Sequence, residues 1–359
     1  MKFRSLFLSV LCMVMMGLSF SACSDDDDDK GDEGSVVELP GARAFILNEG
    51  TYEGNNSGIT FYAPNGDADK IDDIYHLQNN ERLGDTGQDI LNEDSDIFVI
   101  VAGSKRLVKL NKSGVKQAEL SFAGKFGDPR YMAEEDGKLY VTTYGDPGYV
   151  LRIDTKTLTV EDSVAVGFNP ENIVESEDKL YVSNTEWGSG TSVSVIDIKT
   201  FEVIKKIDVL LNPNDLLEVN DDIYLISWGD YFGDPAGQYV LQCINGKTHE
   251  SASLNEKASK MAKYNGIIYL VHSTGVENRF FTYNTKTKKF GESFLKNTPA
   301  ALQTATVYML KVNPNNGEIY IGTTDYQSNG DIYRFHNDGT LIEIFESGGI
   351  NPNHAIFFK

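Results

Sequence analysis

Short runs of β-branched and aromatic residues recur along the chain, separated by polar loops and tight turns. Such runs, bounded by Gly, Asn and Asp, are typical of β-strands. One four-residue pattern, built around a central aromatic position, returns seven times, and successive aromatic positions lie 41 to 53 residues apart. The seven instances are residues 44–47, 97–100, 139–142, 180–183, 223–226, 268–271 and 319–322. A repeat of this length predicts the blades of a β-propeller.

Each repeat divides into four predicted strands, and the repeat around Tyr181 shows the division clearly. Its strands are expected over residues 172–175, 179–183, 193–197 and 201–209, with polar turns between them. No stretch after residue 41 shows sustained helical periodicity. Because a propeller blade is a four-stranded sheet, seven such repeats predict an all-β fold, a seven-bladed β-propeller over residues 41–359.

The two ends of the predicted propeller complement each other. The first repeat begins at its second strand and lacks a first one. The chain ends with residues 351–358, which resemble residues 169–174 and 212–217, and both of these precede a second strand. We therefore expect the C-terminal strand to complete the first blade beside Phe45, which removes open sheet edges.

The N-terminal residues have the features of a bacterial lipoprotein signal. Basic residues precede an apolar stretch over residues 6–18, which is shorter than the roughly 20 residues of a membrane-spanning helix. We expect residues 1–22 to be the signal peptide and Cys23 to be lipidated; the alternative is an ordinary signal peptide with an incidental cysteine. Residues 23–40 are expected to form an acidic, disordered tether.

The tether contains five consecutive aspartates, residues 25–29. It resembles the acidic export signal of Bacteroidetes lipoproteins, which implies a lipid anchor in the outer membrane and a position facing the cell exterior. A plain solvated linker is one alternative. A Ca²⁺ site is another, although the spaced ligands and the turn glycine of a calcium loop are missing.

Composition excludes one class of partner. The chain carries 53 acidic and 32 basic residues, for a net charge of −21. Nucleic-acid binding depends on Lys and Arg neutralising phosphates, so no nucleic-acid partner is expected. Cys12 lies in the expected signal peptide and Cys23 is the expected lipidation site, so Cys243 is the only other cysteine. We expect Cys243 to be a buried apolar side chain.

No motif in the chain requires catalysis, a metal or a cofactor. The five histidines lack metal-ligand spacing, and no CxxC, GxSxG, P-loop or GxGxxG motif is present. The boxes of sialidase-like and quinoprotein propellers are also absent. We therefore expect a binding protein, although a catalytic site assembled from separate blades would escape a motif search.

The aromatic residues indicate where a ligand would bind. Loops between second and third strands emerge on the same face as the connections between blades, around the mouth of the central channel. The aromatic candidates in these loops are Tyr52, Tyr144, Trp187, Trp228, Tyr231, Phe232 and Tyr326. The polar candidates in the connections are Arg82, Asp85, Gln88, Arg130, Asn172, Asn214, Asp215, Asn353 and His354. Together they suit a large neutral ligand; the alternative is that the aromatic side chains pack inward between blades.

A resemblance to known proteins narrows the expected class of ligand. Residues 180–184 and 193–200 resemble the YVTN-type repeat of YncE-like propellers. Residues 45–50, 58–62, 82–89 and 129–132 resemble Bacteroidetes lipoprotein propellers that include the BtuG-type surface proteins. These capture cobalamin and other corrinoids and pass them to a TonB-dependent outer-membrane transporter, so the resemblance implies that function. It carries no binding residue, and it does not require His272 or His354 to ligate cobalt.

Other functions remain open. Aromatic platforms suit sugars equally well, so a surface glycan-binding protein of a polysaccharide-uptake system is the main alternative. Two further alternatives are a propeller lyase or hydrolase and a protein-interaction scaffold.

Overall fold

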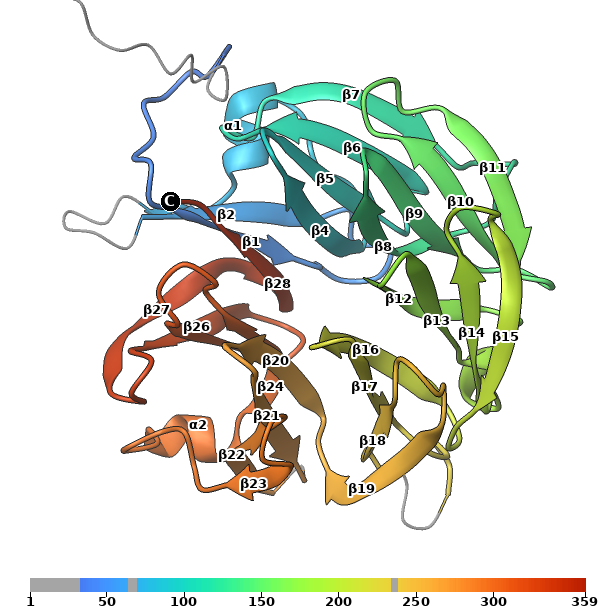
Figure 1. The fold of residues 1–359 in the computed structure, drawn as a ribbon. Helices are drawn as coiled ribbons and strands as arrows, with labels where there is room; N and C mark the ends of the chain where they lie inside the picture. The colour runs from blue at the N-terminus through green and yellow to red at the C-terminus, as the bar shows by residue number, and fades with distance from the viewer. Residues whose placement is uncertain (1–32, 64–69, 234–237, 275) are drawn as a thin grey trace, which may run out of the picture. The chain divides into compact units, whose positions relative to one another are not determined.

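Seven four-stranded antiparallel sheets are arranged around a common centre (Figure 1). The computed structural model describes residues 33–63, 70–233, 238–274 and 276–359. The predicted signal peptide, Cys23 and the aspartate run therefore lie outside the described residues. The all-β, seven-bladed propeller expected from the repeats is confirmed.

The blades are numbered here in chain order, and their strands are given from the centre outward. Blade 1 contains β28 (Pro352–Phe357), β1 (Ala44–Asn48), β2 (Gly58–Tyr62) and β3 (Lys70–Ile71). Blade 2 contains β4 (Gly87–Glu93), β5 (Asp96–Val101), β6 (Arg106–Asn111) and β7 (Lys116–Ser121). Blade 3 contains β8 (Pro129–Glu135), β9 (Lys138–Thr143), β10 (Tyr149–Asp154) and β11 (Val160–Ala165). Blade 4 contains β12 (Pro170–Ser176), β13 (Lys179–Asn184), β14 (Ser192–Asp197) and β15 (Glu202–Asp208).

The remaining blades follow the same plan. Blade 5 contains β16 (Pro213–Val219), β17 (Asp222–Ser227), β18 (Val240–Ile244) and β19 (Ser251–Lys257). Blade 6 contains β20 (Lys260–Tyr264), β21 (Ile267–Ser273), β22 (Asn278–Asn284) and β23 (Lys289–Gly291). Blade 7 contains β24 (Thr306–Val312), β25 (Ile319–Thr324), β26 (Asn329–Phe335) and β27 (Leu341–Ile350).

The strand sequences explain their depth in the fold. The second strands, such as β9 (KLYVTT), are buried along nearly their whole length because neighbouring blades cover both faces. The outermost β7 (KQAELS) alternates half-buried and exposed positions because one of its faces meets solvent. The aromatic residues of the repeat pattern, such as Tyr181 and Tyr224, are fully buried between blades. The repeating pattern therefore builds the core rather than the binding site.

The expected closure of the ring is confirmed. β28 pairs antiparallel with β1, with Ile356 opposite Phe45 and His354 opposite Leu47. Figure 1 shows the last strand lying beside the first. Ile356 also packs into the apolar cluster shared by blades 1 and 2. The C-terminal strand thus links the two ends of the chain through both hydrogen bonds and core packing.

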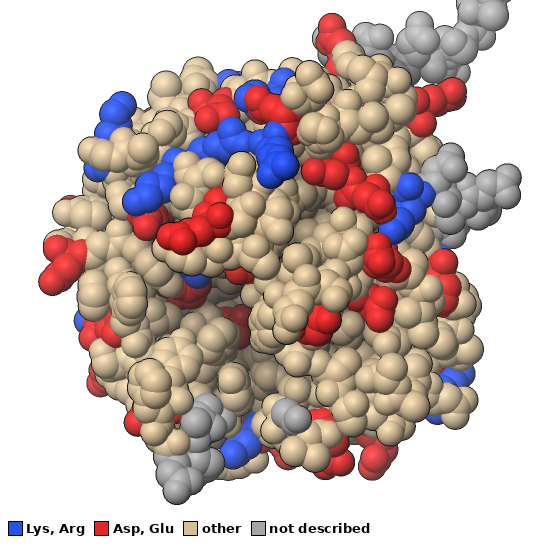
Figure 2. Space-filling view, turned by 180° about the vertical axis from the view of Figure 1, so that it is seen from behind, with Lys and Arg blue, Asp and Glu red and all other residues tan. Residues whose placement is uncertain are grey.

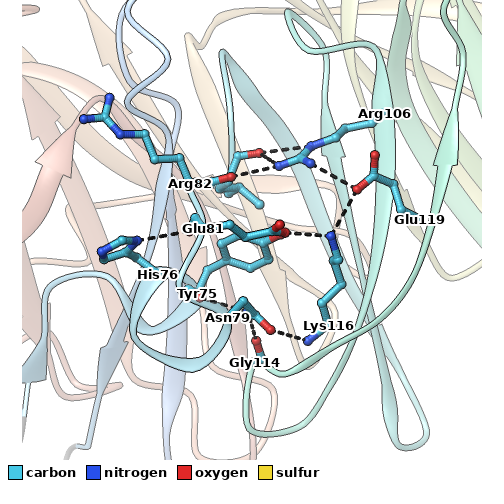
Figure 3. A network of polar contacts seen from close by, with 10 residues as sticks. Tyr75, His76, Asn79, Glu81, Arg82, Arg106, Gly114, Lys116 and Glu119 are labelled. Carbon is cyan, nitrogen blue, oxygen red and sulfur yellow. Dashed lines mark hydrogen bonds and ion pairs between the residues drawn. The ribbon is translucent and has the colours of Figure 1, made fainter.

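Within the described residues, three short helical segments interrupt the strands: α1 (Ile74–Asn79), the 3₁₀ helix η2 (Glu186–Gly188) and α2 (Ala300–Thr304). α1 lies against blade 2 through the polar network in Figure 3. Asn79 Oδ1 accepts a hydrogen bond from the Lys116 amide at 2.8 Å, and Lys116 Nζ reaches Glu81 at 2.7 Å. None of the three is long enough to show the sustained helical periodicity that a sequence search detects.

Residues 33–40, which the sequence placed in the disordered tether, lie against blades 1 and 2. Val37 and Leu39 pack on the apolar cluster of these blades, and the Val36 amide donates to Gln78 Oε1 at 2.9 Å. Asn111 Nδ2 donates to the Glu33 carbonyl at 2.8 Å. Two apolar side chains and these hydrogen bonds hold the segment in place. Among the described residues, no helix is both long enough and apolar enough to cross a membrane.

Candidate functional site

A cavity of about 410 Å³ opens where the innermost strands begin, and it is lined by residues from every blade. The loops between second and third strands lie at the same end, which we call the cavity face. The opposite end, with the turns between first and second strands, we call the turn face. Figure 2 shows a hollow near the centre of the molecule with acidic side chains at its wall.

Two equivalent positions at the start of each innermost strand form most of the wall. Strand registers place these positions at the same height in all seven blades. The first lining position is Asn353, Gln88, Arg130, Glu171, Asn214 and Tyr308 in blades 1, 2, 3, 4, 5 and 7. The second position is His354, Asp89, Tyr131, Asn172, Asp215, Lys260 and Met309 in blades 1 to 7. A propeller built for its core alone would not need this polar lining.

Arg130 and Glu171 form an ion pair across neighbouring blades. Arg130 Nε lies 3.3 Å from Glu171 Oε2, and its Nη2 contacts the other carboxylate oxygen. Tyr144 donates its hydroxyl hydrogen bond to the same carboxylate, and the Arg130 guanidinium lies 4.6 Å from the centre of the Tyr144 ring. These contacts hold the three side chains in a fixed arrangement on this side of the cavity.

A second polar cluster lies deeper, where Asp89, Lys311 and His354 meet. Burial lowers the pKa of Lys311 to about 8 and raises the pKa of Asp89 to about 6. Burial also holds the pKa of His354 well below its ordinary value, so its ring is neutral and Nε2 accepts a hydrogen bond from Lys311. Asp89 instead accepts the amide hydrogen bonds of Met132 and Ile90, each at 3.0 Å.

This cluster separates two halves of the channel. A second cavity of about 320 Å³ continues toward the turn face, with mostly apolar walls from β4, β24 and β28. Asp89, Met132, Lys311 and His354 line both cavities. The polar cluster is therefore the floor of the upper cavity.

Two lysines supply cationic hydrogen-bond donors to the upper cavity. Among the described residues, no carboxylate forms an ion pair with Lys260 or Lys311. The Lys260 ammonium lies 5.5 Å from the centre of the Tyr308 ring. Each cavity carboxylate, in contrast, already accepts a hydrogen bond, as Glu49 does from Tyr308. The cavity therefore presents donors to a ligand that carries acceptors.

Among the described residues, the loops between second and third strands expose five aromatic side chains on the cavity face: Tyr52, Trp187, Tyr231, Phe232 and Tyr326. They connect to the cavity wall through two half-buried neighbours. Tyr231 meets Trp228 edge-on at 6.2 Å, and Trp228 lines the cavity. Tyr326 meets Tyr308 edge-on at 5.9 Å on the other side. The aromatic loops and the polar cavity are thus parts of one surface.

Comparisons with known proteins support the architecture. No family model and no curated protein sequence matches the chain. A quinonprotein alcohol dehydrogenase-like protein from Bacteroides thetaiotaomicron is 17% identical over 88% of this chain and 77% of its own, with a TM-score of 0.64. A functionally unknown protein from Desulfotomaculum acetoxidans is 11% identical over 88% of this chain and 98% of its own, with a TM-score of 0.61. BamB from Moraxella catarrhalis is 13% identical over 87% and 85%, with a TM-score of 0.51.

These three proteins share the overall fold of this chain. Identities this low show the fold alone, because propellers with the same architecture serve many functions. The choice of ligand therefore depends on the site itself.

Half of the residues that the sequence proposed for the site line the cavity. They are Gln88, Arg130, Asn172, Asn214, Asp215, Trp228, Asn353 and His354. The exposed aromatic residues belong to loops on the same face, whereas Tyr144 lies behind Arg130. Arg82 donates to the Asn55 carbonyl at 3.3 Å, and Asp85 accepts from the Glu53 amide at 3.1 Å. These two side chains organise loops outside the cavity lining.

Sequence reasoning missed seven polar or aromatic residues of the wall: Glu49, Asp89, Tyr131, Glu171, Lys260, Tyr308 and Lys311. A signal for three of them was present, because Asp89, Tyr131 and Glu171 each stand beside a residue already selected in equivalent strands. Lys311 lies farther along its strand, and nothing local marks it as facing the channel. His272 is outside the cavity lining. Within the described ranges, no group of three or more His, Cys, Asp or Glu residues is arranged to hold a metal ion.

Proposed function

We propose that this protein captures a large, neutral, amide-rich ligand on its cavity face, with cobalamin and related corrinoids as the ligand class, and passes it to a TonB-dependent outer-membrane transporter. The observation that carries the proposal is the combination of a polar cavity with exposed aromatic side chains around its mouth. A corrinoid combines an apolar macrocycle with peripheral amides. Such a ligand matches both parts of the surface.

The charge of the cavity supports a neutral ligand. Four carboxylates and three cationic side chains are found among its described lining residues: Glu49, Asp89, Glu171, Asp215, Arg130, Lys260 and Lys311. These charges nearly cancel, so neither a polyanion nor a polycation gains much from entering. Lys260 and Lys311 form no ion pair with a carboxylate among the described residues, so their ammonium groups favour carbonyl acceptors, which primary amides provide.

Size supports a ligand that lies mostly outside the cavity. Ligand pockets usually measure about 300–1,000 Å³, and the upper cavity, at about 410 Å³, is near the small end. A macrocycle with its substituents therefore inserts a polar edge and leaves its apolar face against the loops. A rigid, closed propeller presents this surface preorganised, which lowers the ordering cost of binding.

The path of the N-terminal segment supports capture from outside the cell. Residues 33–40 contact Gln78 and Asn111, at the turn face. These residues therefore leave the cavity face uncovered. The proposed binding surface would then be open to the medium, as capture requires.

Co-elution tests the proposal directly. Residues 31–359, the compact unit that contains all seven blades, would be mixed with cyanocobalamin and separated by gel filtration with absorbance detection. The proposal predicts that corrinoid absorbance elutes with the protein. Absorbance only in the small-molecule fractions would contradict it.

A glycan-binding function is the second candidate, favoured by the exposed indole of Trp187, since aromatic faces stack on sugar rings. Titration with oligosaccharides separates the two. Binding of an oligosaccharide without binding of cyanocobalamin would move glycans to first place.

A further inference from the structure

The exposed apolar side chains of the cavity face are distributed unevenly. Blades 1, 3, 6 and 7 each expose a single large one there, Tyr52, Tyr149, Val276 and Tyr326. Blades 4 and 5, with the connections that lead into them, expose six. These six define the blade 4–5 surface: Phe168, Trp187, Leu210, Leu211, Tyr231 and Phe232.

Contacts between the loops make this surface continuous. The Glu186 amide, next to Trp187, donates to the Phe168 carbonyl at 3.2 Å. The Tyr231 ring packs so closely on Gly188 that a Cβ there would lie 2.7 Å from it. The loop of Phe232 is joined to Leu211 by the Gly229 amide, which donates to the Leu211 carbonyl at 3.1 Å.

The same surface runs into the cavity. Tyr231 contacts Trp228, and the Trp228 indole nitrogen donates to Asp215 inside the cavity at 2.9 Å. The apolar surface and the cavity therefore share one wall, formed by blade 5. A single ligand can touch both without a change in the protein.

Backbone conformation holds Trp187 outward. Glu186 and Trp187 have φ values of 48° and 56°, in the left-handed region that residues with a Cβ rarely adopt. The Trp187 side chain is 73% exposed as a result. Strained backbone of this kind clusters at binding sites, where the surrounding structure maintains it. An exposed indole at a strained loop tip gives no core stabilisation, so it needs another reason to be held there.

We propose that the blade 4–5 surface takes the flat apolar face of the captured ligand, so that the ligand lies off the propeller axis, with one polar edge in the cavity. This inference depends on the proposed function and adds to it the position of the ligand. Lys260 and Lys311, on blades 6 and 7, then face the acceptors of that edge. A macrocycle with peripheral amides meets both requirements at once.

Calorimetric titration of residues 31–359 with cyanocobalamin tests the position. Trp187→Ala and Phe232→Ala remove the two most exposed aromatic side chains of the blade 4–5 surface. Tyr52→Ala is the matched control, because Tyr52 is 82% exposed on the same face but belongs to blade 1. We expect Kd to rise at least tenfold in the Trp187→Ala/Phe232→Ala double variant and less than twofold in Tyr52→Ala.

Each outcome has a distinct meaning. If the wild-type protein binds and the double variant binds equally well, or if Tyr52→Ala causes the larger loss, the inferred position is wrong and the proposed function stands. If the wild-type protein does not bind cyanocobalamin, the proposed function fails, and the inference fails with it. Thermal melts of all variants test whether a loss of binding comes from unfolding. We expect unchanged melting temperatures, since every substituted side chain is exposed.

Discussion

The indole nitrogen of Trp228 donates a hydrogen bond to Oδ2 of Asp215 at 2.9 Å, which fixes one aromatic ring at the wall of the cavity. Trp228 is the first residue after β17, and Asp215 lies in the adjacent innermost strand β16. Burial raises the pKa of Asp215, while the indole hydrogen bond opposes that rise. Asp215 is therefore a positioning residue for the ring.

Substitution of Asp215 should weaken ligand binding through Trp228. Asp215→Leu removes the acceptor, and we expect the Kd for cyanocobalamin to rise about tenfold, which corresponds to about 1.4 kcal/mol. Asp215→Asn keeps an acceptor oxygen and should change Kd less than threefold. Near-ultraviolet circular dichroism would report whether the Trp228 ring has moved. Equal losses in both variants would show that the carboxylate charge, rather than the orientation of Trp228, matters.

The Arg130–Glu171 pair should matter for stability more than for binding. Side-chain exposure is 19% for Arg130 and 6% for Glu171, so loss of one partner leaves a largely desolvated charge. We expect Glu171→Ala to lower the free energy of unfolding by about 3 kcal/mol. The double variant Arg130→Met/Glu171→Leu should recover most of that loss. Urea denaturation measures both, and a double variant as unstable as the single one would contradict the explanation.

The stability of the protein should depend on pH through Asp89. Its pKa of about 6 is above the ordinary value of 3.8, so the folded protein binds this proton more tightly than the unfolded chain does. The destabilising effect of the carboxylate is therefore full above pH 6 and fades as the pH falls toward 4.5.

Asp89→Asn lacks this titration. The stability advantage of the variant over the wild-type protein should shrink by about 2 kcal/mol between pH 7 and pH 4.5. Denaturation curves at several pH values supply the measurement, and a constant difference would mean that the pKa of Asp89 is not raised.

The C-terminal strand should be essential for folding. Deletion of residues 353–359 removes most of β28, including Ile356 and its packing in the core of blades 1 and 2. We expect the truncated protein to lose its cooperative thermal transition, whereas deletion of the exposed Lys359 alone should have little effect. An unchanged melting temperature in the longer truncation would refute the role of the closure.

Sequence reasoning predicted the fold because the fold depends on a repeated local pattern. Each blade repeats the same alternation of apolar and polar residues and the same turns. The first repeat lacks its first strand, and the C-terminus carries one extra strand, so the closure of the ring is visible in the sequence. The cavity depends instead on which side chains of seven distant strands converge. Asp89 and Lys311 are 222 residues apart in the sequence (311 − 89) and meet only when the ring closes.

The exposed aromatic residues were predictable for a different reason. Trp187 and Phe232 lie in loops whose polar neighbours leave nothing for them to pack against, and both are exposed in the structure. Arg82 and Asp85 look similar in sequence, but their side chains bond to nearby backbone groups. Such local hydrogen bonds have no distinctive sequence pattern.

Lipid anchoring is expected to depend on Cys23. Cys23→Ser should abolish labelling with a radioactive fatty acid and release the protein from the membrane fraction. Replacement of the five aspartates at positions 25–29 by serine should preserve acylation but protect the protein from protease added to intact cells. Persistent protease sensitivity in that variant would mean that surface export does not require the acidic run.

Calorimetric titration of residues 31–359 with cyanocobalamin tests the central claim most directly. The account predicts saturable binding of one corrinoid per protein molecule, together with a rise in melting temperature at saturating ligand. Absence of both heat and thermal shift at high ligand concentration would contradict corrinoid capture, and would leave the propeller with a cavity that serves another ligand.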